Sequence, residues 1–200
     1  MALQLDSKTR LNFEHAAILL VEQSPHGLEV LQQILTGFGA RRCVRASTIE
    51  AAQQEIKHTV FDLVLIDPAF SDADGYDFIR WLRRSETPAN RTAPIIVLSS
   101  NGAKSAILRA RNAGANFFLK KPITPASLLE RIVWITKDPR QFVEAAQYAG
   151  PDRRFRFEGP PPGEAPRRAD DITTKLDDAG QPNLSQSDID ALLKPQKVQL

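Results

Sequence analysis

The chain has few of the features that mark secreted, membrane-spanning or strongly charged proteins. It contains one cysteine, Cys43, so no disulfide framework can form within it. The formal net charge of +2 gives no global field that would favour nucleic acid or anionic lipid as a partner. The apolar run at residues 16–21 is much shorter than a membrane span, and the first residues lack the apolar core of a signal peptide. These absences favour a cytoplasmic protein without membrane association.

Short apolar runs alternate five times with stretches whose apolar residues recur at helical spacing. The runs are typical of strands covered on both faces, and they occupy residues 16–21, 42–46, 63–66, 94–99 and 116–120. The helical stretches occupy residues 26–38, 48–58, 75–84, 103–112 and 125–137. Right-handed crossovers then give an α/β fold with a doubly wound, five-stranded parallel sheet. We predict an N-terminal extension at residues 1–14 and one compact domain over residues 15–137.

Local signals indicate where several of these helices begin and end. Ser47 with Glu50 has the spacing of a capping box, and Thr124 precedes a proline that suits the first turn of a helix. Gly39 and Gly114 stand where two helices should end.

Four polar residues come at the ends of the predicted strands: Glu22, Asp67, Ser99 and Lys121. In open parallel α/β sheets, ligands bind beyond the carboxyl ends of the strands, so these side chains should meet there. Carboxylates, a hydroxyl and an ammonium at one place are the groups that a magnesium-assisted phosphorylation site needs.

The segments that carry these residues resemble a known family. They are ILLVEQSP at residues 18–25, DLVLIDPAFSDADG at 62–75, PIIVLSS at 94–100 and NFFLKKPI at 116–123. Together they are similar to the receiver domain of two-component response regulators, of which the chemotaxis protein CheY is a simple example. The resemblance covers about residues 15 to 137 and implies the flavodoxin-like receiver fold.

The resemblance also implies a role for each strand-end residue. Asp67 matches the aspartate that accepts a phosphoryl group, and Lys121 matches the lysine that pairs with that phosphate. Ser99 matches the switch hydroxyl, Phe118 the switch aromatic, and Pro122 the family's cis-proline. A sensor histidine kinase or a phosphotransfer protein would supply the phosphoryl group.

The implied magnesium site departs from the family at one position. Glu22 and Gln23 match the acidic pair that holds Mg²⁺, with Asp67 and the backbone carbonyl of Ala69 as further ligands. Gln23 is a neutral amide where the family has a carboxylate, so we expect weaker Mg²⁺ binding. The two readings left open are a receiver phosphorylated on Asp67 and a pseudo-receiver that acts without phosphorylation.

The composition changes beyond residue 138. Residues 138–183 are rich in proline, glycine and arginine, and we predict a largely extended or disordered arm and linker. Phe142, Tyr148 and Phe155 could pack this arm onto the domain. A patch of arginine and phenylalanine at residues 153–157 has the composition of a nucleic-acid contact, but nearby acidic residues nearly neutralise its charge, so nucleic acid is not expected as a partner.

The chain's last informative stretch is NLSQSDIDALL, within which residues 184–194 are predicted to form a short helix. Ser185 and Asp188 have capping-box spacing. The apolar residues expected to bind a partner are Leu184, Ile189, Leu192 and Leu193. The string resembles the N-terminal segment of the flagellar motor switch protein FliM, which binds phosphorylated CheY. This resemblance implies a CheY-like receiver, in the same or another chain, and flagellar motor components as partners.

The predicted function is a response regulator without a separate output domain, acting by protein contact in chemotaxis or flagellar motility. The terminal peptide could dock on the chain's own fourth and fifth predicted helices, or it could recruit another CheY-like receiver as an adaptor. A third class, the aspartate-nucleophile phosphatases, uses similar residues with a second aspartate two positions after the nucleophile. Position 69 is alanine, so the chain is not expected to be an enzyme.

Overall fold

A computed structural model describes residues 13–137, 140–153 and 183–193 of the chain. Most of the predicted N-terminal extension, most of the predicted linker and residues 194–200 lie outside the described residues. Within the described part of the chain, no helix is long and apolar enough to cross a membrane.

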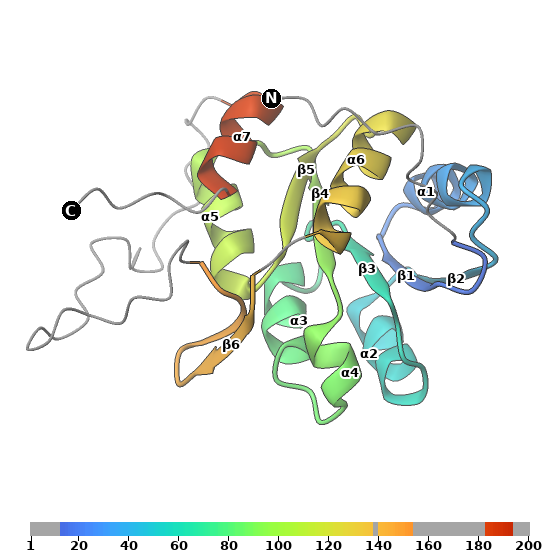
Figure 1. Cartoon of the computed structure of the whole chain (residues 1–200). Coiled ribbons are helices and arrows are strands. Elements are labelled where there is room, and N and C mark those ends of the chain that lie inside the picture. Colours follow the sequence, from blue (N-terminus) through green and yellow to red (C-terminus); the bar gives the residue numbers. More distant parts are fainter. Residues whose placement is uncertain (1–12, 138–139, 154–182, 194–200) are drawn as a thin grey trace, which may run out of the picture.

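The centre of the molecule is a parallel sheet of five strands in the order β2-β1-β3-β4-β5 (Figure 1). The strands are β1 Ala17–Val21, β2 Arg42–Ala46, β3 Leu63–Ile66, β4 Ile95–Ser99 and β5 Phe117–Lys120. Each lies within one residue of its predicted bounds, so the α/β fold predicted from the apolar runs is confirmed. The strand order reverses between β1 and β3, which places their carboxyl ends at the crevice where such sheets bind ligands.

Six helices accompany the sheet: α1 Pro25–Gly37, α2 Ile49–His58, α3 Gly75–Leu82, α4 Pro88–Thr92, α5 Lys104–Ala113 and α6 Pro125–Thr136. A seventh, α7 Gln186–Leu193, comes near the end of the chain. Right-handed crossovers place α2, α3 and α5 on one face of the sheet and α1 on the other. The short helix α4 was not predicted; its first residue, Pro88, supplies the fixed φ that suits a helix start.

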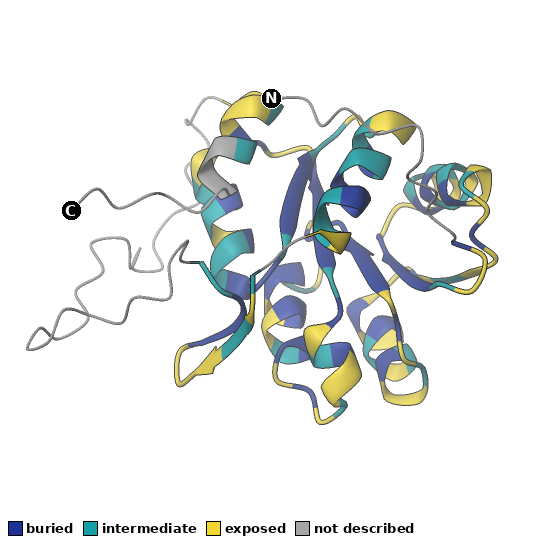
Figure 2. Cartoon of the chain, viewed as in Figure 1, coloured by how far each residue is buried: buried dark blue, intermediate teal, exposed yellow. Residues whose placement is uncertain are grey.

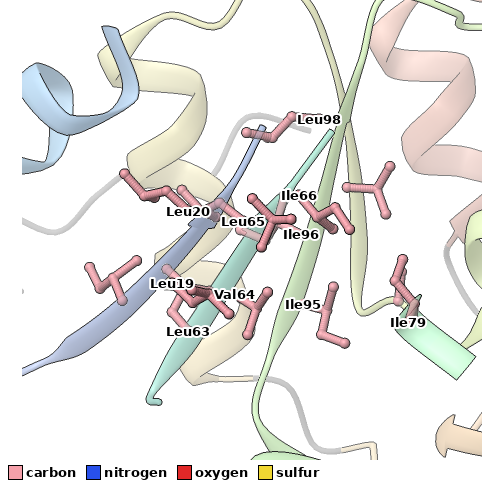
Figure 3. Packing of buried hydrophobic residues seen from close by; sticks show 14 of the residues in the cluster. Leu19, Leu20, Leu63, Val64, Leu65, Ile66, Ile79, Ile95, Ile96 and Leu98 are labelled. Carbon is pink, nitrogen blue, oxygen red and sulfur yellow. The ribbon is translucent and has the colours of Figure 1, made fainter. Parts of the chain in front are cut away.

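The core lies between the sheet and its two helical layers (Figure 2). Every residue of β1, β3 and β4 is buried, and their aliphatic side chains pack together in the centre (Figure 3). Burying one such side chain contributes about 1.5–3 kcal/mol. The edge strand β2 is more exposed than these three. The continuous apolar runs in the sequence therefore reflect strands covered on both faces.

One predicted helix start was wrong. Helix α2 begins at Ile49, and its N-cap is Thr48, whose hydroxyl accepts a hydrogen bond from Ala51 N at 3.1 Å. Thr48 has the extended backbone of an N-cap residue and occupies the position expected for Ser47, so the Ser47–Glu50 capping box does not form. The capping box of α6 at Thr124 is confirmed. Positive φ values of 89° at Gly39 and 103° at Gly114 confirm the predicted ends of α1 and α5.

Residues 142–151 form a hairpin where an extended or disordered arm was expected. Strands β6 Phe142–Ala145 and β7 Tyr148–Pro151 pair in antiparallel fashion. Their connecting residues, Ala146 and Gln147, are not the residues from which hairpin turns are recognised, so no turn could be predicted here. Tyr148 is buried and Phe142 lies under the guanidinium of Arg83, which agrees with the predicted docking of both aromatic residues. Phe155 lies outside the described residues.

Candidate functional site at the carboxyl edge of the sheet

Three of the four predicted strand-end residues meet in one ion-pair cluster. Lys121 Nζ lies 2.5 Å from Glu22 Oε2 and 2.5 Å from Asp67 Oδ2. Both carboxylates are buried, with 4% of Glu22 and 6% of Asp67 exposed. Lys121 is partly exposed and follows the edge strand β5, and its peptide bond to Pro122 is cis, as the resemblance implied. The cluster thus joins the ends of β1, β3 and β5.

Glu22 is aimed into the cluster by the first turn of α1. Its second oxygen, Oε1, accepts a hydrogen bond from Ser24 N at 3.0 Å, close to the favourable positive end of the helix. A Cβ on Gly27 would lie 2.8 Å from Glu22 Cδ, so a side chain at position 27 would displace the carboxylate. Gly27 is a positioning residue that the sequence reasoning missed. The pattern that could have predicted this role is a glycine in the first turn of the helix that comes shortly after Glu22.

Asp67 is fixed by the loop that follows β3. Asp67 Oδ1 accepts a hydrogen bond from Ala69 N at 2.8 Å, and Asp67 N donates to Val21 O at 2.9 Å. A Cβ on Gly75 would lie 2.5 Å from Pro68 Cα, so the start of α3 can approach this loop only with glycine at position 75. Asp67 is therefore held by backbone contacts on both sides.

The ammonium of Lys121 is stabilised by its two carboxylate partners. Burial alone would lower the pKa of Lys121, but the hydrogen bonds and charges of Asp67 and Glu22 outweigh that effect and raise it. The lysine therefore keeps its positive charge at neutral pH. A fixed cation beside Asp67 is the group that an incoming phosphoryl anion needs.

Gln23 does not point into the cluster. Its Nε2 donates to Ser71 Oγ at 2.7 Å, and its Oε1 accepts from Ser71 N at 3.0 Å. Both ends of the amide are occupied by the loop between β3 and α3. The role of Gln23 in this geometry is to fasten that loop to the end of β1.

The two predicted switch residues lie apart from the ion pairs. The Ser99 hydroxyl accepts a hydrogen bond from Asn101 N at 3.2 Å, and among the described residues no hydrogen bond links it to Asp67 or Lys121. Lys121 N nevertheless donates to Ser99 O at 2.9 Å, so the two residues are joined through the backbone. The Phe118 side chain is completely buried.

The residues present fit a weakly held divalent cation. In the described ranges, no group of three or more His, Cys, Asp or Glu side chains could hold a metal ion. Glu22 and Asp67 nevertheless place two carboxylates together, and Mg²⁺ commonly uses one or two carboxylates with water and phosphate oxygens. Both already share Lys121, so a metal would compete with or shift that ammonium. Ala69 follows Asp67 by two residues, and its carbonyl stays a predicted ligand.

The predicted partner-binding helix is also present, and it contacts the domain itself. Helix α7 packs on α5 and β5, and Ile189 is completely buried while Leu184 is partly buried against the core (Figure 1). The predicted capping box forms, since Ser185 N donates to Asp188 Oδ2 at 3.3 Å and Asp188 N donates to Ser185 Oγ at 3.3 Å. The side chains of Leu192 and Leu193 lie outside the described residues.

A five-stranded parallel sheet with a carboxylate–lysine cluster at its carboxyl edge defines the receiver class of signalling domain. A family model, the response regulator receiver domain, matches residues 18–133. The chain therefore belongs to the response regulator receiver family.

Similar proteins agree with this assignment. The chain is 32% identical over 115 residues to the KDP operon transcriptional regulatory protein KdpE of Escherichia coli, covering 58% of this chain and 48% of that protein. It is 30% identical over 118 residues to the sensory/regulatory protein RpfC of Xanthomonas campestris, covering 58% of this chain and 16% of that protein. The chain thus spans half or less of the length of these curated relatives.

Solved structures show the same fold. A putative response regulator from Chloroflexus aurantiacus has a TM-score of 0.56 and 31% identity, covering 62% of this chain and 98% of that one. The receiver domain of the sensor histidine kinase PA1611 from Pseudomonas aeruginosa has a TM-score of 0.54 and 30% identity, covering 60% and 95%. In that structure a magnesium ion is coordinated in the active-site cleft.

Proposed function

We propose that this receiver accepts a phosphoryl group on Asp67 and signals by protein contact, in the control of chemotaxis or flagellar motility. The observation that carries the phosphorylation proposal is the cluster in which Lys121 Nζ lies 2.5 Å from both Glu22 and Asp67. The pathway is supported by the terminal string NLSQSDIDALL and its resemblance to the FliM segment.

The geometry suits nucleophilic attack by Asp67 on a phosphoryl donor. Its carboxylate is held by Ala69 N on one oxygen and by Lys121 on the other, so it is oriented before the donor arrives. An Asp67 oxygen would form a bond to phosphorus while the bond to the donor's leaving group breaks, giving an acyl phosphate. Lys121 would then bind the new phosphate oxygens. A magnesium ion held by Glu22, Asp67 and the Ala69 carbonyl would neutralise charge on the phosphoryl group.

The loop after β4 is the element that would respond to phosphorylation. Lys121 N donates to Ser99 O, and the Ser99 hydroxyl holds Asn101 N at the start of that loop. New phosphate oxygens beside Lys121 would offer the Ser99 hydroxyl a charged partner in place of Asn101 N. Movement of this loop would change the surface formed by α5 and β5.

The alternative function is a pseudo-receiver that acts as an adaptor without phosphorylation. Its support is the orientation of Gln23, which bonds Ser71 and leaves the metal site with two carboxylates. In that case the terminal peptide would recruit another CheY-like receiver, whatever the state of Asp67.

Phosphorylation can be tested by incubating the full chain with acetyl phosphate and Mg²⁺ and measuring intact mass. We expect one added phosphate in the wild type and none in Asp67→Asn. The variant Gln23→Asp restores a carboxylate beside Glu22, and we expect it to reduce the Mg²⁺ concentration needed by about tenfold. Absence of phosphate in both the wild type and Gln23→Asp, even at high Mg²⁺, would establish the adaptor.

A further inference from the structure

Residues 183–193, here called the terminal segment, lie against α5 and β5 of the same chain (Figure 1), and Asp190 pairs with Arg131 of α6. The residues that receive its polar contacts are Gly102, Phe118, Lys120 and Arg131, and we call them the docking face. The contacts on this face specify both a backbone register and a charge pattern.

The side chain of Gln186 forms hydrogen bonds with the backbone of the edge strand β5. Its Oε1 accepts from Lys120 N at 2.9 Å, and its Nε2 donates to Phe118 O at 3.2 Å. These two groups of β5 face away from β4 and would otherwise lack a strand partner. A primary amide supplies one donor and one acceptor, as the backbone of a neighbouring strand would.

The residues before α7 bind the loop that follows β4. Gly102 N donates to Asn183 Oδ1 at 2.9 Å, and Leu184 N donates to Gly102 O at 2.9 Å. A Cβ on Gly102 would lie 3.3 Å from Leu184 O, which is a crowded contact. The close approach of the segment to this loop therefore requires little side-chain volume at position 102.

Charge and apolar burial complete the fit. Arg131 is buried, and its guanidinium pairs with Asp190 of the terminal segment. Lys120 Nζ donates to Leu184 O at 3.3 Å. Ile189, between the polar residues Gln186 and Asp190, is completely buried. Gln186 and Asp190 are four residues apart and share a helix face, and Gln186 Nε2 donates to Asp190 Oδ1 at 2.9 Å.

We propose that the terminal segment is a displaceable ligand of its own docking face, and that it competes there with a helix of another protein. The competing helix would carry the same chemistry: a glutamine, an isoleucine three positions later and an aspartate directly after it. An eight-residue helix is not stable alone in water, so the segment is helical only while docked and releases by losing that contact. This proposal goes beyond the phosphorylation proposal and does not require Asp67 to be phosphorylated.

Competition can be measured with a fluorescein-labelled peptide, NLSQSDIDALL, added to full-length chains and followed by fluorescence anisotropy. A tethered copy acts at an effective concentration of about a millimolar, so the wild type should bind the peptide weakly. Ile189→Asp and Asp190→Arg, each made in the full chain, should release the tethered copy and tighten peptide binding by about tenfold or more. Ser187→Ala alters an exposed position of the same helix and should bind like the wild type.

Peptide variants show whether the same contacts are used in trans. A peptide in which its glutamine is replaced by glutamate keeps the acceptor but loses the donor to Phe118 O, and it should bind at least several-fold more weakly. Equal peptide affinity in the wild type and both released variants would overturn the proposal, as would failure of every chain to bind the peptide. A dimer seen by light scattering that disappears in Ile189→Asp would assign the face to a second copy and overturn the intramolecular arrangement.

Discussion

Two additions to the receiver domain, the hairpin β6–β7 and the terminal segment, both contact α5, yet they are attached by different physics. The hairpin packs Phe142 against Arg83, a buried cation that binds backbone carbonyl groups of the domain, and it accepts hydrogen bonds from Arg84 at Ala146 O and from Arg91 at Glu144. The terminal segment is attached by one buried isoleucine, by side-chain hydrogen bonds and by a backbone hydrogen bond from Leu184 N to Gly102 O. The hairpin therefore packs on buried residues of the domain, whereas the terminal segment is the addition that we propose can leave.

Arg83 lies where the hairpin meets the core of the domain. Its guanidinium donates to Gly114 O at 2.8 Å, Arg91 O at 2.7 Å and Ala93 O at 2.6 Å, and it lies 5.7 Å from the ring centroid of Phe142. Burial lowers the pKa of Arg83, but to a value that leaves the side chain charged at pH 7. A cation satisfied by carbonyl groups ties α3, α5 and the loop before β4 to the hairpin.

The largest expected effect is therefore on Arg83. Replacing it by leucine leaves several buried carbonyl groups without donors, and we expect a loss of about 3–5 kcal/mol in the free energy of unfolding. Urea denaturation of the full chain measures it. The matched control is Arg84→Met, because exposed Arg84 makes a single bond to Ala146 O at 2.8 Å, and it should lose less than about 1 kcal/mol. Equal losses would show that the carbonyl groups bound by Arg83 contribute little to stability.

A second test concerns the contact between the hairpin and the end of α5. Gly114 has φ of 103°, and a Cβ there would lie 2.4 Å from Ala149 O and 2.9 Å from Arg83 Cγ. Gly114→Ala should lose about 2–4 kcal/mol in urea denaturation, since strain and a backbone collision add. Gly37→Ala is the control: its Cβ would meet nothing within 4 Å, and the change should be neutral or slightly stabilising. A neutral Gly114→Ala would mean that the hairpin can shift away.

The sequence predicted the structure correctly where a local pattern of residues determines it. Continuous apolar runs predicted the five strands, and polar residues at their ends predicted the cluster of Glu22, Asp67 and Lys121. The direction of Gln23 could not be predicted, because it depends on Ser71 in another loop. The hairpin was missed because its turn carries no typical turn residues and its contacts, from Phe142 to Arg83 and from Ala146 O to Arg84, are made with residues far away in the sequence.

The terminal helix lies between these cases. Its capping box and apolar residues could be predicted from their spacing. The roles of Gln186 and Asp190 could not, because their partners are the backbone of β5 and the side chain of Arg131. Burial of Ile189 favours the intramolecular alternative of the two proposed for the peptide, because an exposed Ile189 would have suited capture of another receiver. Sequence spacing cannot predict the partner of a polar group when that partner lies far away in the sequence.

If the terminal segment can leave the domain, a substitution within it can lower the free energy of unfolding only by a limited amount. Ile189→Ala and Ile189→Asp should reduce the free energy of unfolding equally, by about 1–2 kcal/mol, because the loss cannot exceed the free energy of docking. Ile96 in β4 provides the contrast: it is also completely buried, and aspartate there should be far worse than alanine. Hydrogen exchange should show residues 186–193 unprotected in both Ile189 variants while the sheet is unchanged. A greater loss for Ile189→Asp would place the segment in the core.

The smallest expected effect is a dependence of the hairpin on alkaline pH. Burial raises the pKa of Tyr148 above its ordinary value of 10.0, and its hydroxyl donates to Pro151 O at 2.6 Å. Above about pH 10 the unfolded chain loses this proton while the folded chain keeps it, so the stability that the neutral form contributes falls as pH rises. Burial also raises the pKa of Tyr76, to about 12, so part of the slope remains when Tyr148 is replaced.

The measurement is the urea midpoint of the wild type and Tyr148→Phe between pH 9 and about pH 10.5. Tyr148→Phe should be less stable at pH 9 because it lacks the bond to Pro151 O, but its stability should decline less steeply. The difference between the two slopes should stay below the limit of about 1.4 kcal/mol per pH unit for one proton. The terminal segment contains no tyrosine, so its hydrogen-exchange protection should show no such difference between the two chains. Parallel slopes would mean that Tyr148 is solvated, and the hairpin would then resemble the terminal segment in being able to detach.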